Sequence, residues 1–190
     1  GATHQGLYDI AFLRTLPNMV VMAPKDENEL RHMLKTAIYH KGPIALRYPR
    51  GSGLGVRLDQ EMGELEIGKG EVIKDGTDMA IFAYGHMVDR AVTVSNVFEK
   101  EGISVAVINA RFAKPVDKNL IIKYAKKVRC LITMEEHSLK GGFGSAVLEA
   151  LQEEQICSIP VKCIGLGDMV LEHGAPGQQR KDLKLDPEGI

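Results

Sequence analysis

Two short motifs near the start of the chain carry side chains able to move protons and to bind phosphate. The first, Thr3–Gly6, contains His4, and the second, Arg47–Gly51, contains two arginines, Arg47 and Arg50. Histidine changes its charge near neutral pH, so His4 is a candidate general acid or base. The forked guanidinium of arginine suits a phosphate group. Together the motifs predict a site for proton handling and phosphate binding.

The surroundings of His4 bear on its role. It precedes Gly6 and a predicted helix over residues 7–14. This would place it at a helix N-terminus, where backbone N–H groups attract anions and polar substrates. A histidine in that place can equally cap the helix or accept structural hydrogen bonds, so both interpretations stay open.

Arg47 and Arg50 lie where a predicted strand over residues 43–48 gives way to a glycine-containing loop. Because Pro49 breaks the strand alternation, we expect Arg50 to point outward at the carboxyl end of the strand. Ligands of open α/β sheets bind at such ends. Arg47 is the weaker candidate, and structural ion pairs are the alternative for both arginines.

Other polar groups could suggest chemistry but favour structural roles. Glu135–His137 precedes Gly141–Gly144 without the spacing of a zinc motif or the lysine ending of a P-loop. We interpret this stretch as a tight strand-to-helix connection, and the glycine turn at 165–168 as a similarly weak signal. Four more histidines have no convincing partner in the sequence and are expected to be surface or hydrogen-bonded residues: His32, His40, His86 and His173.

The composition is that of an ordinary globular protein. The chain has 190 residues, of which 44% are hydrophobic and 26% charged. A net charge of -1 gives no reason to expect nucleic acid or an anionic membrane as partner. The basic run over residues 123–129 is expected to be the solvated face of a helix. No apolar run approaches the ~20 residues needed to span a bilayer.

Cysteine usage and the start of the chain bear on location. The 3 cysteines lack Cys-x-x-Cys spacing, which argues against a disulfide framework or a zinc site. Cys130 and Cys163 lie in apolar runs and are expected to be buried free thiols in a reducing compartment. The cytoplasm is therefore the default expectation. A plastid location stays open, because the chain starts at Gly1 and a targeting signal would lie upstream.

The elements that must position the motifs alternate along the chain. Strands over residues 19–23 and 43–48 flank a helix that starts after Asp26, with Glu29 at the capping-box offset. A linker then leads into an edge strand over residues 70–74. The second half has further predicted strands over 79–84, 104–109, 130–134 and 161–164, and helices over 88–100, 118–127 and 144–153. This alternation predicts an α/β fold of three αβα layers, with a mostly parallel five-stranded sheet in the second half.

In order, three segments resemble the thiamine-diphosphate-dependent transketolase family. They are THQGLYDIAFLRTLPNMVVMAPKDENELRHML from residue 3, GPIALRYPRG from residue 42, and MEEHSLKGGFGSAVLE from residue 134. The likeness runs almost end to end. It implies that residues 1–65 are the second half of a pyrimidine-binding domain plus a linker, and that residues 66–190 are the C-terminal domain. The diphosphate-binding domain would be absent, so the fragment is expected to be inactive alone.

The resemblance also implies a reaction and its participants. The motifs are similar to those of the family branch that condenses pyruvate with glyceraldehyde 3-phosphate, releasing CO2, in the first step of non-mevalonate isoprenoid precursor synthesis. This branch also feeds thiamine and pyridoxal synthesis. Thiamine diphosphate and Mg2+ would serve the full-length enzyme, a homodimer, with the metal ligands outside this fragment.

The resemblance assigns residues as well. His4 matches the family's active-site histidine, and Arg50 matches the arginine that binds the substrate phosphate. Tyr48 and Arg47 would support the loop. No cofactor-binding or metal-binding residue is assigned within the fragment. The alternatives are a transketolase, a 2-oxo acid dehydrogenase β subunit, and a non-catalytic assembly module of the same fold.

Overall fold

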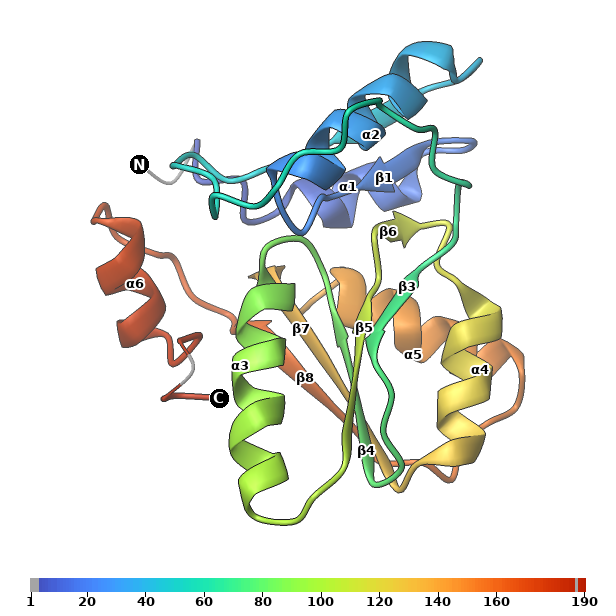
Figure 1. Ribbon diagram of the computed structural model, residues 1–190, viewed down its shortest axis with the longest axis vertical. Helices are drawn as coiled ribbons and strands as arrows, with labels where there is room; N and C mark the ends of the chain where they lie inside the picture. Colours follow the sequence, from blue (N-terminus) through green and yellow to red (C-terminus); the bar gives the residue numbers. More distant parts are fainter. Residues whose placement is uncertain (1–3, 187) are drawn as a thin grey trace.

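A small N-terminal unit lies across one end of a larger α/β unit in the computed structural model, which describes residues 4–186 and 188–190 (Figure 1). The small unit contains α1 (Asp9–Thr15), β1 (Val20–Met22), α2 (Glu27–Tyr39) and β2 (Ile44–Leu46). β1 pairs in parallel with β2 and in antiparallel with β6 (Phe112–Lys114), a strand that the chain contributes later. This pairing joins the two units.

The larger sheet has five strands in the order β3-β5-β4-β7-β8. They are β3 (Glu71–Lys74), β4 (Met79–Ala83), β5 (Val105–Asn109), β7 (Cys130–Ser138) and β8 (Val161–Leu166). All neighbouring pairs are parallel except β3 with β5. All five residues of β5 are buried, as expected for a central strand covered on both faces. The predicted mostly parallel sheet, with its edge strand, is confirmed.

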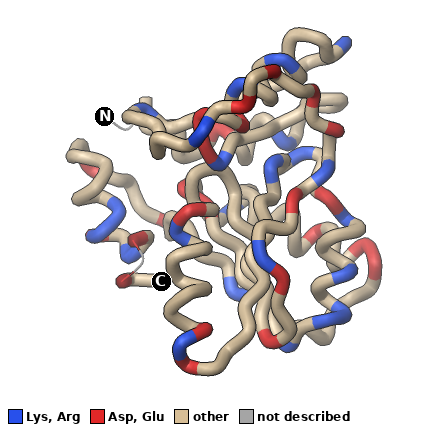
Figure 2. The backbone as a smooth tube through the Cα atoms, viewed as in Figure 1, with Lys and Arg blue, Asp and Glu red and all other residues tan. Residues whose placement is uncertain are grey.

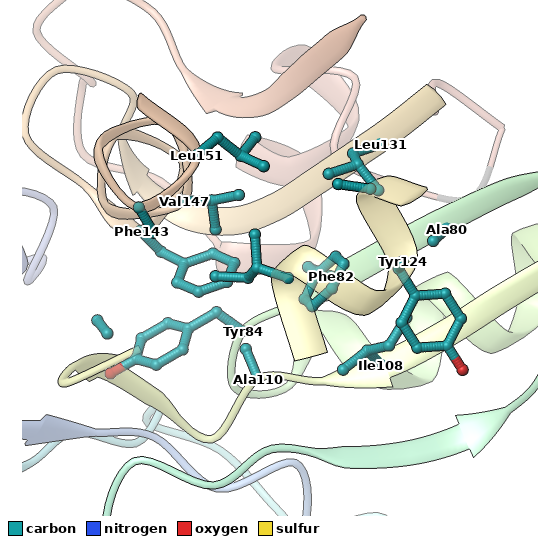
Figure 3. Packing of buried hydrophobic residues seen from close by; sticks show 14 of the residues in the cluster. Ala80, Phe82, Tyr84, Ile108, Ala110, Tyr124, Leu131, Phe143, Val147 and Leu151 are labelled. Carbon is teal, nitrogen blue, oxygen red and sulfur yellow. The ribbon is translucent and has the colours of Figure 1, made fainter. Parts of the chain in front are cut away.

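Helices cover both faces of this sheet and complete three layers. α3 (Met87–Lys100) packs on one face, and α4 (Lys118–Lys127) and α5 (Phe143–Glu153) pack on the other. Figure 3 shows the core under α4 and α5. There Tyr84 stacks on Phe143 with ring centroids 5.3 Å apart, and Phe82 meets Tyr124 edge-on at 6.1 Å. The three-layer αβα prediction is therefore confirmed.

The last helix, α6 (Pro176–Asp182), follows β8 and lies on the α3 side of the sheet. It buries none of its own residues. Leu183 and Leu185, which follow it, pack into the core beneath α3. The C-terminal segment is thus held by two leucines and by the polar contacts described below.

Acidic and basic residues are interspersed along the backbone of the two units (Figure 2). The lysines of α4 at positions 123, 126 and 127 are exposed, which confirms the predicted solvated helix face. Within the described residues, no helix has both the length and the apolar character needed to cross a membrane.

The start of α2 follows its predicted cap only in part. The Asp26 side chain accepts a hydrogen bond from the Glu29 amide at 2.8 Å, as an N-cap should. Glu29 does not return the bond to Asp26, however. Its buried carboxylate accepts from the Lys25 amide at 2.8 Å, from Asn109 at 2.9 Å and from Arg111 Nε at 2.6 Å. The capping-box offset therefore marks an anchor between the two units.

The linker between β2 and β3, all of it described, forms no helix or strand and lies along α2. The Glu27 carboxylate accepts from three successive linker amides, Leu54, Gly55 and Val56, at 2.6–3.0 Å. Thr36 Oγ1 accepts from the Leu65 amide at 2.8 Å. These bonds satisfy the backbone of a segment that has no sheet partner.

Several predicted boundaries are wrong. α1 begins at Asp9 and not at residue 7, so His4 precedes the N-cap residue Tyr8 and does not lie at the helix N-terminus. β7 continues to Ser138, where it still pairs with β8, and does not end at residue 134. β6 was not predicted, because a three-residue strand depends on its partner in the other unit.

The cysteine prediction is also partly wrong. All three cysteines are free thiols, but Cys130 and Cys163 are only half-buried, and Cys157 is exposed. Cys130 begins β7 at the end of the sheet, and Cys163 lies on β8, which is an edge strand. Both positions are less covered than the centre of the sheet.

Candidate active site

A cavity of about 730 Å³ lies between the two units, at the carboxyl ends of strands from both sheets. Its wall combines the N-terminal segment, the loops after β1, β2 and β4, the ends of β7 and β8, and the region of α6. Ligands of open α/β sheets bind at the carboxyl ends of strands. The topology therefore places a cavity between the two units at a position typical of ligand-binding sites.

His4 and Arg50, the two residues singled out in the sequence, both line this cavity. Both are exposed to solvent, so a ligand can reach them. The Arg50 guanidinium forms no hydrogen bond or ion pair with any described residue, which leaves it available to an anion. Thr3, which belongs to the same motif as His4, lies outside the described residues.

Arg47 connects the two motifs. Its Nε lies 2.9 Å from Asp9 Oδ2, and its Nη2 donates to the Gly6 carbonyl at 2.8 Å. The structural ion pair left open for Arg47 is thus present, and it ties the Arg50 loop to the His4 segment. Tyr48 also lines the cavity and is largely exposed.

His137 lies in the cavity wall on β7 and is fully buried. Its Nε2 accepts a hydrogen bond from the Ile10 amide at 3.0 Å, and its Nδ1 lies 2.8 Å from the Ser138 carbonyl oxygen. Burial lowers the pKa of this histidine. The sequence pattern placed His137 in a connection, because its partner in the small unit, Ile10, lies 127 positions away.

Glu135, also on β7, is fully buried and anchors the start of α5. Its carboxylate accepts from the amides of Phe143 at 2.6 Å and Gly144 at 2.8 Å. Burial raises the pKa of Glu135 to about 7, although the two amide hydrogen bonds oppose the rise. A Cβ on Gly142 would lie 2.2 Å from Glu135 Oε2, so glycine is needed there. The glycine-rich stretch is the predicted tight strand-to-helix connection.

Glu136 contacts two basic side chains at the rim of the same cavity. His86 Nε2 lies 2.7 Å from Glu136 Oε1, and Arg180 Nε donates to that same oxygen. Burial alone would raise the pKa of Glu136, but these two partners outweigh it and lower the pKa to about 2. Arg180 thereby holds α6 against the sheet.

The remaining histidines fall into two groups. His32 pairs with Asp59 at 2.9 Å, so like His86 it has a carboxylate partner that the sequence did not reveal. His173 is exposed and lines the cavity, whereas His40 ends α2 away from it. A polar Glu-Glu-His run that continues an apolar strand is the one sequence signal that could have pointed to the β7 side of the site.

Family comparisons agree with this architecture. The family model of the transketolase pyrimidine-binding domain matches residues 1–54, and that of the transketolase C-terminal domain matches residues 68–190. The chain belongs to the transketolase family.

Individual relatives are more specific. The chain is 52% identical over 190 residues to 1-deoxy-D-xylulose-5-phosphate synthase 1 of Geobacter sulfurreducens, covering 100% of this chain and 30% of that protein. It is 56% identical over 189 residues to 1-deoxy-D-xylulose-5-phosphate synthase of Thermosynechococcus vestitus, covering 98% of this chain and 30% of that protein. The chain thus spans 30% of the length of these curated relatives.

Solved structures share the fold. A structure described as "Split gene transketolase, inactive beta4 tetramer" has a TM-score of 0.86 and 34% identity, and covers 100% of this chain and 61% of that chain. A transketolase mutant from Pichia stipitis has a TM-score of 0.69 at 22% identity, and covers 100% of this chain and 26% of that chain. The second likeness concerns the fold alone.

Proposed function

We propose that the protein containing this chain is a 1-deoxy-D-xylulose-5-phosphate synthase. It would condense pyruvate with D-glyceraldehyde 3-phosphate to give 1-deoxy-D-xylulose 5-phosphate and CO2. The observation that carries the proposal is that His4 and Arg50 line one cavity in a chain 52–56% identical to such synthases along its length.

Arg50 is the phosphate-binding residue in this proposal. Its exposed side chain lines the cavity from the loop after β2, and its guanidinium forms no hydrogen bond or ion pair with a described residue. A forked cation of this kind binds phosphate oxygens through two parallel hydrogen bonds. Arg47 is the weaker candidate for this role, because its Nε and Nη2 already donate to Asp9 and to the Gly6 carbonyl.

His4 is the proton-handling residue. It is exposed and lines the cavity, so a substrate bound there can exchange a proton with its ring. The Arg47 bond to the Gly6 carbonyl holds the segment that carries it.

The cofactor proposed is thiamine diphosphate with Mg2+. Gln5 Oε1 is buried in the cavity wall without a hydrogen-bond partner among the described residues, so a donor group of a bound organic cofactor would satisfy it. The described residues contain no group of three or more side chains that could hold a metal ion. The residues present therefore fit the organic part of the cofactor. When bound, it supplies the electron sink for the loss of CO2.

The extent of the chain enters the proposal too. We place the domain division between residues 65 and 66, which is supported by family matches that end at residue 54 and begin at residue 68. The fragment would be inactive alone, and the related split-gene chain is described as an inactive tetramer. The whole enzyme would be a cytoplasmic homodimer that serves isoprenoid precursor and thiamine synthesis.

An assay of the complete enzyme tests the proposal. Product should form from pyruvate and glyceraldehyde 3-phosphate, and a ketose donor should not replace pyruvate. Arg50→Ala should raise the KM for glyceraldehyde 3-phosphate by about tenfold or more, because a charge-assisted hydrogen bond contributes on the order of 1.5–3 kcal/mol. The pyruvate KM should change little. Arg57→Ala, at an exposed linker arginine outside the cavity, is the matched control. Equal losses for both substrates would refute the phosphate role.

A further inference from the structure

His137 belongs to the larger unit, but its ring contacts the start of α1 in the small unit. Nε2 accepts from the Ile10 amide at 3.0 Å and lies 3.4 Å from the Ala11 amide. Amides in the first turn of a helix have no partner within the helix. The residue at the N-cap position, Tyr8, provides no side-chain cap. His137 therefore supplies the missing cap from 127 positions away.

The contacts of the two ring nitrogens of His137 require the same protonation state. Nδ1 lies 2.8 Å from the Ser138 carbonyl oxygen. A carbonyl oxygen only accepts, so Nδ1 carries the proton and donates it. Nε2 then has a free lone pair, which is what the Ile10 amide requires. A doubly protonated ring would set an N–H against the Ile10 N–H, so only the neutral ring fits this contact.

Ionisable side chains face the His137 ring from three elements. Asp9 Oδ1 on α1 lies 3.9 Å from Nε2, and Glu135 Oε2 on β7 lies 3.8 Å from Nδ1. Arg47, from the loop after β2, opposes a second positive charge. Burial acts in the same direction and lowers the pKa of His137. The ring is therefore neutral around pH 7 and becomes protonated only in acid.

The capped helix end leads directly to the active-site motifs. Asp9 is the first residue of α1 and pairs with Arg47 at 2.9 Å. Arg47 also holds the Gly6 carbonyl, two residues after His4. The Ser138 amide adds a backbone bond to the Leu7 carbonyl at 2.9 Å. A shift of the α1 start would therefore move both the His4 segment and the Arg50 loop.

We propose that neutral His137 is a positioning residue, through which the C-terminal domain sets the geometry of the His4 segment and the phosphate-binding loop. This inference rests on the proposed function for its kinetic consequences only. The capping contact itself can be tested by amide exchange, which needs no turnover.

Two substitutions in the complete enzyme distinguish the loss of the hydrogen-bond acceptor from the loss of the imidazole ring itself. His137→Leu removes the acceptor and should speed amide hydrogen exchange in a peptide covering residues 7–16 by about tenfold. It should raise the KM for glyceraldehyde 3-phosphate about tenfold, with the pyruvate KM within about twofold. His137→Gln offers an oxygen near the Nε2 position that does not titrate. This variant should return the exchange rate over residues 7–16 and the glyceraldehyde 3-phosphate KM to wild-type values. It should also lack any rise in that KM that the wild type shows in acid.

His32→Gln is the matched control, because this histidine on α2 pairs with Asp59 away from α1. It should leave exchange and both KM values unchanged. Unchanged exchange over residues 7–16 in His137→Leu would overturn the proposal. So would equal rises in both KM values with faster exchange throughout the protein, since that result describes a general loss of folding. If the wild type makes no product, the proposed function fails, whereas the exchange comparison still decides the capping contact.

Discussion

Arg47 and Asp9, 38 positions apart in the sequence, form an ion pair in which Nε lies 2.9 Å from Oδ2, and this pair joins the Arg47–Gly51 motif to the start of α1. Each side chain is 24% exposed, so the pair is better shielded than an ordinary surface pair. Its second bond, from Arg47 to the Gly6 carbonyl, extends the link toward His4. Although both arginines of the motif were candidates, this pair separates their roles, because Arg47 is engaged and Arg50 is not.

A double-mutant cycle on Asp9→Ala and Arg47→Ala should give a coupling energy of about 1–2 kcal/mol. This value lies between the energies typical of exposed ion pairs and those of fully buried charged hydrogen bonds. The measurement is the free energy of unfolding in urea. The exposed pair Lys140 and Asp168 is the control and should couple more weakly than Asp9 and Arg47, because solvent screens it. A coupling no larger than in this control would contradict a linking role.

Glu29→Ala should be strongly destabilising. Glu29 is 3% exposed and accepts from Asn109 and Arg111. Its removal takes the nearer acceptor from the buried Asn109 amide and leaves the half-buried Arg111 with Glu71 as its only described carboxylate partner. We expect a loss of about 3–5 kcal/mol in the free energy of unfolding. Glu153→Ala, at an exposed partner of Lys118, should cost less than about 1 kcal/mol. Similar losses of unfolding free energy in both variants would show that Glu29 does not anchor the small unit to the larger one.

The stability of the protein should carry a pH dependence from Glu135. Its pKa is raised from 4.5 to about 7 by burial. Between these pH values the native state keeps a proton that the unfolded chain releases, so stability falls as pH rises. The fall amounts to about 3 kcal/mol, at 1.36 kcal/mol per pKa unit.

Glu135→Gln, which does not titrate, isolates this contribution. As pH rises from 4.5 to 7, the unfolding free energy of the wild type should fall relative to that of the variant. Subtracting the variant also removes the opposite slope of His137, whose lowered pKa makes stability rise with pH. A difference independent of pH would mean that Glu135 is ionised throughout the window.

Gly142→Ala should disrupt the connection between β7 and α5. The added Cβ would meet Glu135 Oε2 at 2.2 Å and the Ser138 carbonyl at 2.5 Å, so the carboxylate must leave the amide of Phe143. We expect a loss of about 1–3 kcal/mol from overpacking, measured by thermal unfolding. Gly177→Ala on α6 is the control, because nothing lies within 4 Å of the added Cβ, and it should be neutral or slightly stabilising.

His4→Ala in the complete enzyme should lower turnover by roughly 10²–10⁴, as expected when a general acid or base is removed. The measurement is kcat at saturating concentrations of both substrates. His40→Ala, at the end of α2 and outside the cavity, should leave kcat unchanged. Turnover near that of the wild type would return His4 to a structural role.

Local patterns in the sequence were enough to predict the larger sheet. Apolar runs such as residues 79–83 and 105–109 are buried on both faces, and the alternating helices impose parallel pairing. The exact ends of the strands were harder to predict from the sequence. β7 extends to Ser138 because β8 and the Leu7 carbonyl continue its hydrogen bonding, and neither partner is near it in the sequence.

For the site, the sequence by itself determined which side chains could act. The His4 imidazole and the Arg50 guanidinium line one cavity, because Arg50 follows the carboxyl end of β2 and Arg47 of the same loop holds the Gly6 carbonyl beside His4. Tertiary structure alone decided that Arg47 is engaged by Asp9, that Glu136 binds His86 and Arg180, and that His137 caps α1. The physical reason is that periodicity and capping report contacts within a few residues, whereas these partners meet only once the two units have packed together.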